Sequence, residues 1–232
     1  EATTFTGTGN RNIDFRGKAV EVKGELGTDD TIINCQSQDR GFVFITSETA
    51  GSILRNLTIR NGLDAGGSGG GILVDGSSPL ITDVKIEDCT AGSGGGIAVL
   101  SNSSPTIQNC EISGCRATGV IDLFGGGGIY SLEATPVVDQ CDIHDNVAES
   151  NGGGISLTLG GTYTNNRIHG NTAGKGGGVR ISAGRLANGV VAGNTSSGTT
   201  TSYNQGGGVG MSGGTVVNCT VADNHSEAHG GG

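Results

Sequence analysis

The residues best suited to chemistry in this sequence are two histidines and three charged side chains near them. His144 and His169 occupy the same place in two successive segments of similar pattern, and Asp142 and Arg167 stand two residues before them. Glu111 holds the position of Asp142 in the preceding segment. An imidazole beside carboxylates suits general acid–base catalysis or a weak metal site. The competing interpretation is a solvent-exposed face whose charges pair between segments, as Asp142 would with Arg167.

These residues belong to a repeat that runs through most of the chain. Seven segments share the pattern, namely "LRNLTIRNG" (54–62), "ITDVKIEDC" (81–89), "IQNCEISGC" (107–115), "VDQCDIHDN" (138–146), "YTNNRIHGN" (163–171), "LANGVVAGN" (186–194) and "VVNCTVADN" (216–224). Glycine runs lead into apolar stretches whose first residues lie 24 to 32 residues apart, at Ile72, Ile97, Ile129, Ile155, Val179 and Val209. A period in this range is typical of solenoids, whose units stack on one another.

Apolar and polar residues alternate within each unit, which predicts short β-strands. Val84 and Ile86 flank Lys85, so we expect the two apolar side chains to face a core and the lysine to face outward. Ile97 and Ala98 begin the same alternation after a glycine run. One unit cannot bury its apolar face alone, so neighbouring units must stack. The sequence therefore predicts an all-β fold, a right-handed parallel β-helix (β-solenoid) of about eight or nine coils.

The predicted β-helix extends over the whole sequence. We expect a single domain over 1–232, with irregular first coils at 1–50 and the repeats at 51–232. The closing "HGGG" (229–232) matches the glycine runs that elsewhere lead into a strand. We therefore expect the chain to be truncated at its C-terminus.

With these repeats the chain resembles the right-handed parallel β-helix repeat family found in many secreted bacterial proteins. The pairs "IHDN…GGGI" and "IHGN…GGGV" are also similar to the F-x-x-N and G-G-A-[ILV] repeats of polymorphic outer-membrane adhesins, with Ile in place of Phe and Gly in place of Ala. The resemblance implies an extracellular or cell-surface setting. The same scaffold carries pectate lyases, polygalacturonases, alginate-modifying enzymes, adhesins and fibres, so it implies no single activity.

Polar side chains recur at two corners of the predicted coils. One column contains Asn146, Asn171, Asn194 and Asn224, and Cys89 and Cys115 continue it. The other column contains Asn56, Asp83, Asn109, Gln140, Asn165, Asn188 and Asn218. Stacked amides can form hydrogen bonds along the axis, so we expect structural ladders at both corners. A general preference of Asn for turns explains one column but not the repeated offset from the apolar residues.

The cysteines follow the same repeat. Cys110 and Cys141 are equivalent in adjacent coils, and so are Cys89 and Cys115. Equivalent Cα atoms one coil apart are about 4.8 Å from each other, which lies in the disulfide range. The pairs can therefore form disulfides or remain buried free thiols. No C-x-x-C motif is present, so we expect no zinc site.

The glycine runs have a structural explanation. "GSGGGIAV" (92–99) leads into a strand and not into the helix that a phosphate-binding loop requires. Glycines at a tight corner supply a positive φ and allow the next coil to approach closely. We expect the runs to form the corner at which each coil enters its next strand.

Two insertions interrupt the period at the same corner, "RATGVIDLF" (116–124) and "TSSGTTTSYNQ" (195–205). Insertions on one face of a solenoid often form its binding surface. The candidate binding residues are Val120, Ile121, Leu123, Phe124 and Tyr203. The alternative is a lid packed over the core.

The composition argues against several classes of function. The 232 residues include 47 Gly and 3% aromatic residues, and the net charge is −9 with no basic run. Nucleic-acid binding depends on Lys and Arg contacts to phosphate, so we expect no nucleic-acid partner. No stretch approaches the roughly 20 apolar residues of a membrane helix, so we expect no membrane span. The scarcity of aromatic rings weakens a carbohydrate-binding platform.

The leading interpretation is an extracellular, non-catalytic surface, adhesive or filament-forming module. Its expected partners are a second copy stacked end to end, a further domain of a longer chain, or a polysaccharide or host or cell surface. The alternative is a polysaccharide lyase or glycoside hydrolase that acts on acidic polysaccharide through the five charged and histidine residues above. A third interpretation is metal-dependent adhesion. We expect no cofactor, and calcium has no binding motif in its favour.

Overall fold

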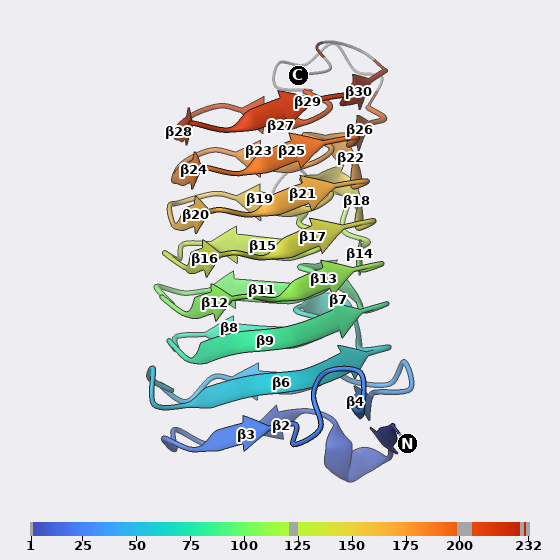
Figure 1. Ribbon diagram of the computed structural model, residues 1–232, viewed down its shortest axis with the longest axis vertical. Coiled ribbons are helices and arrows are strands. Elements are labelled where there is room, and N and C mark those ends of the chain that lie inside the picture. The colour runs from blue at the N-terminus through green and yellow to red at the C-terminus, as the bar shows by residue number, and fades with distance from the viewer. Residues whose placement is uncertain (1, 121–124, 199–205, 228–229, 231–232) are drawn as a thin grey trace.

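The computed structural model describes residues 2–120, 125–198, 206–227 and 230, and the coils stack along one axis (Figure 1). Three sheets run the length of the stack. The first sheet has 15 strands: β1 (Thr3–Phe5), β3 (Glu21–Lys23), β4 (Thr31–Asn34), β6 (Ile53–Arg60), β9 (Leu80–Glu87), β12 (Thr106–Gln108), β13 (Glu111–Ser113), β16 (Val137–Asp139), β17 (Asp142–His144), β20 (Thr162–Thr164), β21 (Arg167–His169), β24 (Arg185–Ala187), β25 (Val190–Ala192), β28 (Thr215–Val217) and β29 (Thr220–Ala222).

The second and third sheets are narrower. The second has eight strands: β2 (Ile13–Asp14), β5 (Phe42–Phe44), β8 (Ile72–Asp75), β11 (Ile97–Leu100), β15 (Ile129–Leu132), β19 (Ile155–Leu157), β23 (Val179–Ile181) and β27 (Val209–Met211). The third has seven: β7 (Leu63–Ser68), β10 (Thr90–Ser93), β14 (Arg116–Ala117), β18 (Val147–Asn151), β22 (Thr172–Lys175), β26 (Thr195–Ser196) and β30 (His225–Ser226). A short 3-10 helix covers Thr8–Asn10.

Each coil visits the three sheets in the same order. From β11 the chain enters β12 and β13, then β14, and returns to the second sheet as β15. There Ile129 pairs in parallel with Ile97 of the coil before. One strand per coil in the second sheet gives about eight coils. The predicted all-β, right-handed parallel β-helix is therefore confirmed.

The interior consists of aligned aliphatic side chains. In the first sheet Ile112 pairs with Ile86 and Ile143, and all three side chains are fully buried. The second sheet supplies the facing column that contains Ile97 and Ile129. Burial of one such side chain stabilises the fold by about 2 kcal/mol, so stacked aliphatic residues supply most of the core. Its aromatic members are Phe15, Phe42, Phe44 and Tyr163.

A row of outward positions departs from the predicted alternation, because Ala98 and its equivalents Tyr130 and Ser156 in the next two coils are all buried. Ala98 is fully buried, yet it does not belong to the core cluster that contains its neighbours Ile97 and Val99. Its register partners on either side are Leu73 and Tyr130, whose larger side chains flank it. A small outward side chain between two large ones loses contact with water.

The first 50 residues already belong to the stack. β5 pairs with β8, and both β3 and β4 pair with β6, one with each half of that long strand. In the described ranges, no helix is long and apolar enough to cross a membrane.

Candidate functional site

The five candidate residues for acid–base chemistry lie together on the outer face of the first sheet. Glu111, Asp142 and Arg167 form one row in register along β13, β17 and β21. His144 and His169 form the adjacent row. Because side chains two residues apart on a strand share a face, the rows lie side by side. The sequence prediction that these residues share a face is confirmed by the register.

The charges in this face pair along the axis. Lys85 Nζ lies 3.8 Å from Glu111 Oε2, and Arg167 Nη1 lies 3.4 Å from Asp142 Oδ2. Lys85 also binds Asp29 at 2.7 Å. The predicted pairing of Asp142 with Arg167 is present, and each bond joins one coil to another.

The two histidines stack on each other. Their ring centroids are 4.8 Å apart and the ring planes differ by 9°. His169 Nε2 lies 2.9 Å from Asp142 Oδ1. His144 has a carboxylate at each ring nitrogen, Asp145 at 2.8 Å from Nδ1 and Glu111 at 3.6 Å from Nε2.

These five residues lie on an open sheet face, and one of them, Glu111, also lines a groove. This groove of about 310 Å³ lies farther along the same sheet and is lined in part by Lys85, Glu111 and Asp83. Neither histidine lines it. Within the described parts of the chain, no group of three or more His, Cys, Asp or Glu side chains is placed to hold a metal ion. The face presents these charged and polar side chains to solvent.

An inner asparagine column joins successive coils at the corner between the first and third sheets. Asn146, Asn171 and Asn194 are fully buried. The backbone N–H of each donates to the side-chain Oδ1 of the next, at 3.0 Å for Asn146 to Asn171, 3.0 Å for Asn171 to Asn194 and 2.9 Å for Asn194 to Asn224. Each Nδ2 also donates to a carbonyl of the preceding coil, as Asn171 does to Ile143 at 2.9 Å.

The outer column at the other corner differs in kind. Asn109, Asn165, Asn188 and Asn218 all have φ between 52° and 57°. Only some of them bond to the same column, as Asn218 Nδ2 does to Asn188 Oδ1 at 2.8 Å. Asn165 donates instead to Asp139 at 2.7 Å. Their shared feature is the left-handed backbone that Asn tolerates better than most residues, so the turn preference accounts for this column.

A buried side chain that also joins coils at the outer-column corner lies one residue after Asn165, and the sequence analysis missed it. Asn166 is buried, its Nδ2 donates to Val138 O at 3.0 Å and its Oδ1 accepts from Cys141 N at 2.8 Å. Cys110 and Cys141 occupy the same inward position in earlier coils, since the flanking residues pair in register. The doublet Asn165–Asn166 was the available signal.

The glycine runs form the predicted corners. Gly94, first in its triplet, has φ of 60°. A Cβ on Gly95 would lie 2.5 Å from the Arg116 backbone, and a Cβ on Gly96 would lie 2.7 Å from Gly128 O. The first glycine therefore makes the turn, and the other two allow the next coil to pack against it.

A family comparison agrees with this geometry. Residues 22–232 match the family model described as right handed beta helix region. The chain belongs to the right-handed β-helix family. No curated protein and no solved structure matches this β-helix.

The cysteines of this β-helix are free thiols in the structure. Cys89 and Cys115 continue the inner asparagine column, and Cys115 N donates to Asn146 Oδ1 at 2.9 Å. A thiol–thiol hydrogen bond with Cys115, together with burial, raises the pKa of Cys89. The corresponding contact with Cys141, together with burial, raises the pKa of Cys110.

The β-helix also contains a buried carboxylate that the sequence analysis did not identify. Glu48 is 2% exposed and accepts hydrogen bonds from Gly17 N at 2.7 Å, Thr46 N at 2.9 Å, Thr46 Oγ1 at 2.5 Å and Ser77 Oγ at 2.9 Å. Burial alone would raise the pKa of Glu48, but these bonds outweigh it and hold the pKa at about 2. Glu48 thus anchors a corner of the first coils.

The candidate binding loops are described only in part. Val120 is 79% exposed, as a surface loop residue would be. Ile121, Leu123, Phe124 and Tyr203 lie outside the described residues.

Proposed function

We propose that this β-helix is a non-catalytic module that works outside the cell, at a cell surface or in a filament, as a rigid adhesive scaffold. The observation that carries the proposal is the pairing on the outer face of the first sheet. Glu111, Asp142, His144, Arg167 and His169 each contact another charged or titratable side chain of their own coil or a neighbouring one. These contacts serve coil stacking, and the face is open to solvent. The proposal requires no cofactor.

The same face supports adhesion through polar contacts. It presents alternating charges and two half-buried histidines over several coils, with 62% of the Arg167 side chain exposed. A charged polysaccharide or a cell surface can form many weak ion pairs with such a face, and repetition along the rod makes them additive.

Binding and cleavage assays on acidic polysaccharides test the proposal. The chain should be retained on immobilised uronate polymers or on cell surfaces in a salt-dependent manner and should release no product from a uronate panel. Arg167→Ala should weaken retention, while Arg185→Ala, on a different row of the same sheet, should change it less. Product release by the wild-type chain would contradict the proposal.

The contact between Asp142 and His169 favours a second candidate function, an enzymatic one. A histidine with a carboxylate at 2.9 Å is the arrangement of an oriented general base. If the protein is a polysaccharide lyase or glycoside hydrolase, the double variant His144→Ala/His169→Ala should abolish cleavage. An inert wild type would rule this candidate out.

Filament formation by end-to-end stacking is the second part of the proposal. Inward side chains of the last described coil, Val216 and Val221 among them, are only partly buried. At the opposite end a groove of about 390 Å³ is lined by Phe5, Val22 and other apolar residues. The apolar surface at both ends can pair with a second copy through the contact that joins coils inside the molecule. Negative-stain microscopy should show rods several molecules long, and only single rods at high concentration would contradict stacking.

A further inference from the structure

We propose that the thiol pairs Cys89/Cys115 and Cys110/Cys141 are cross-linking sites that become axial disulfides while the coils assemble in an oxidising compartment. The inference rests on the extracellular setting proposed above. Its readout, the covalent state of four sulfurs, is separate from adhesion or filament formation, so either proposal can fail alone.

The register places the partners of each pair opposite one another. Gln108 pairs with Asp139 and Glu111 with Asp142, which brackets Cys110 and Cys141. Glu87 pairs with Ser113 and Thr90 with Arg116, which brackets Cys89 and Cys115. Neighbouring strands are about 4.8 Å apart, and disulfides accept Cα distances of about 4.4–6.8 Å.

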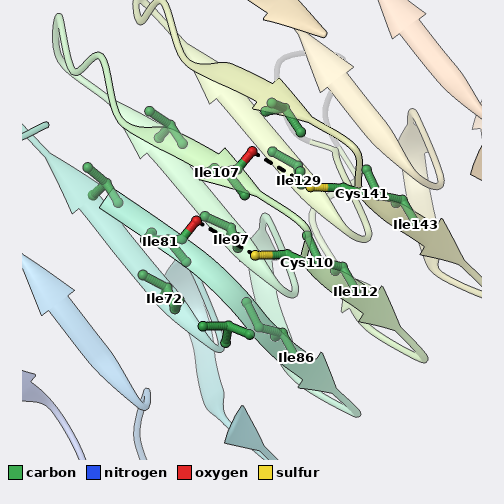
Figure 2. Close-up of a cluster of buried hydrophobic side chains, with 14 of the residues drawn as sticks. Ile72, Ile81, Ile86, Ile97, Ile107, Cys110, Ile112, Ile129, Cys141 and Ile143 are labelled. Atoms are coloured by element: carbon green, nitrogen blue, oxygen red, sulfur yellow. Dashed lines mark hydrogen bonds between the residues drawn. The ribbon is translucent and has the colours of Figure 1, made fainter. Parts of the chain in front are cut away.

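The sulfur of the later cysteine already lies toward the coil of the earlier one. Cys141 Sγ is 3.7 Å from Ile107 O, in the coil of Cys110, and Figure 2 shows this contact beside the equivalent one from Cys110 to Ile81. Cys115 Sγ is likewise 3.7 Å from Ile86 O, in the coil of Cys89. Each bond therefore requires side-chain rotation and no change of strand pairing.

The chemistry is thiol–disulfide exchange with a small disulfide such as oxidised glutathione. One cysteine thiolate attacks the glutathione disulfide and releases one glutathione thiolate, which leaves a mixed disulfide. The second cysteine then attacks the protein sulfur of that mixed disulfide and releases the other glutathione. Two protein thiols are oxidised, one glutathione disulfide is reduced to two thiols, and the two cysteine protons end on glutathione.

Burial determines when this exchange can occur. All four sulfur-bearing residues are at most 2% exposed, so neither an oxidant nor a reductant reaches them once the coils have closed. Burial also disfavours the thiolate that must attack. The disulfides therefore form before closure and are then protected by the same burial.

Two other cysteines serve as internal controls. Cys219 is half-buried, and Gly189 occupies the equivalent position one coil earlier, because Val217 and Thr220 bond to Asn188 and Gly189. Cys35 is separated from Cys89 by the coil of Gly62, whose N–H contacts Cys89 Sγ at 3.3 Å. Neither has a cysteine at the equivalent position of an adjacent coil.

Thiol mapping of the full chain from two compartments tests the proposal. The chain is exported to an oxidising periplasm or kept in a reducing cytosol, alkylated during lysis, digested and mapped by mass spectrometry. The exported chain should contain Cys89–Cys115 and Cys110–Cys141 cross-links, with Cys35 and Cys219 unpaired. The cytosolic chain should have six alkylatable thiols after unfolding, and oxidised glutathione added to its folded form should modify Cys219 alone.

Four free thiols at these positions in the folded, exported chain would overturn the proposal, and so would cross-links between the two pairs. Rapid cross-linking of the folded cytosolic chain would overturn the assembly-stage formation. The double variant Cys89→Ser/Cys115→Ser is the matched control, because the Cys110–Cys141 cross-link should persist in it unchanged.

Discussion

Replacing the buried carboxylate of Glu48 by an amide should cost stability in a strongly pH-dependent way. Each carboxylate oxygen of Glu48 accepts from one backbone N–H and one hydroxyl. In Glu48→Gln the NH2 group must replace one of these oxygens. Whichever way the amide is placed, it then faces the N–H of Gly17 or of Thr46, and one buried donor loses its acceptor.

The expected magnitude follows from the pKa of Glu48. A carboxyl whose pKa falls from 4.5 in the unfolded chain to about 2 in the folded one contributes about 3 kcal/mol at neutral pH. Because the folded pKa is the lower one, this contribution is complete above about pH 5 and is lost as the pH falls toward 2. Glu48→Gln should therefore lower the free energy of unfolding by about 3 kcal/mol at pH 7.

Urea unfolding at pH 7, 5, 4 and 3 measures this difference. The gap between wild type and Glu48→Gln should narrow with falling pH, since a protonated Glu48 also presents a donor to its partners. Glu25→Gln is the matched control, because that side chain is 80% exposed and forms an ion pair with Lys23 at 3.7 Å. A gap that stays constant from pH 7 to 3, or a variant as stable as the control, would refute the reasoning.

Three further substitutions test other parts of the stack by urea or thermal unfolding. Gly96→Ala should destabilise by about 1–3 kcal/mol because its Cβ would meet the next coil, whereas Gly66→Ala, with open space around its Cβ, should be nearly neutral. Asn171→Ala should cost about 2–4 kcal/mol because it leaves a buried N–H and a buried carbonyl unpaired. Asn218→Ala should cost about 1 kcal/mol, because it affects a left-handed backbone position and one exposed hydrogen bond, to Asn188. Equal costs would contradict the distinction between the two columns. Asp142→Asn should cost less than about 1 kcal/mol, and high salt should reduce that loss, because its ion pairs are exposed.

The coil architecture was predictable because two features decide it, the alternation of apolar and polar residues and the position of the glycines. A shift of one residue would expose the buried column that contains Ile112 and bury Glu111 and Ser113, so the alternation alone specifies the register. The glycine corners were equally predictable, because only glycine combines positive φ with close backbone approach. Asn165 and Asn166 were harder to predict. Asn165 has the left-handed backbone and directs the side chain of Asn166 inward. The residue types alone do not reveal which of the two asparagines adopts the left-handed conformation.

The sequence predicted which residues of the candidate site lie next to one another, but not which hydrogen bonds and ion pairs their side chains form. Equivalent positions in successive repeats become register partners, which places His144 beside His169 without further information. The contact of His144 with Asp145, and the burial of Glu48, depend on side-chain orientation at turns. Two of the four donors to Glu48 come from Ser77 and Gly17, which are 29 and 31 positions away, so no local pattern could indicate them.

The inner asparagine column keeps successive coils aligned even though the coils differ in their number of residues. The chain distance spanned by one step of the column varies between 23 and 31 residues, while the N–O distance stays at 2.9–3.0 Å. A segment added between β26 and β27, or between β14 and β15, does not change the position at which the next amide must bond. The loop cost grows only with the logarithm of its length. This β-helix can therefore accept foreign peptides in the β14–β15 and β26–β27 connections while the spacing between its coils stays the same.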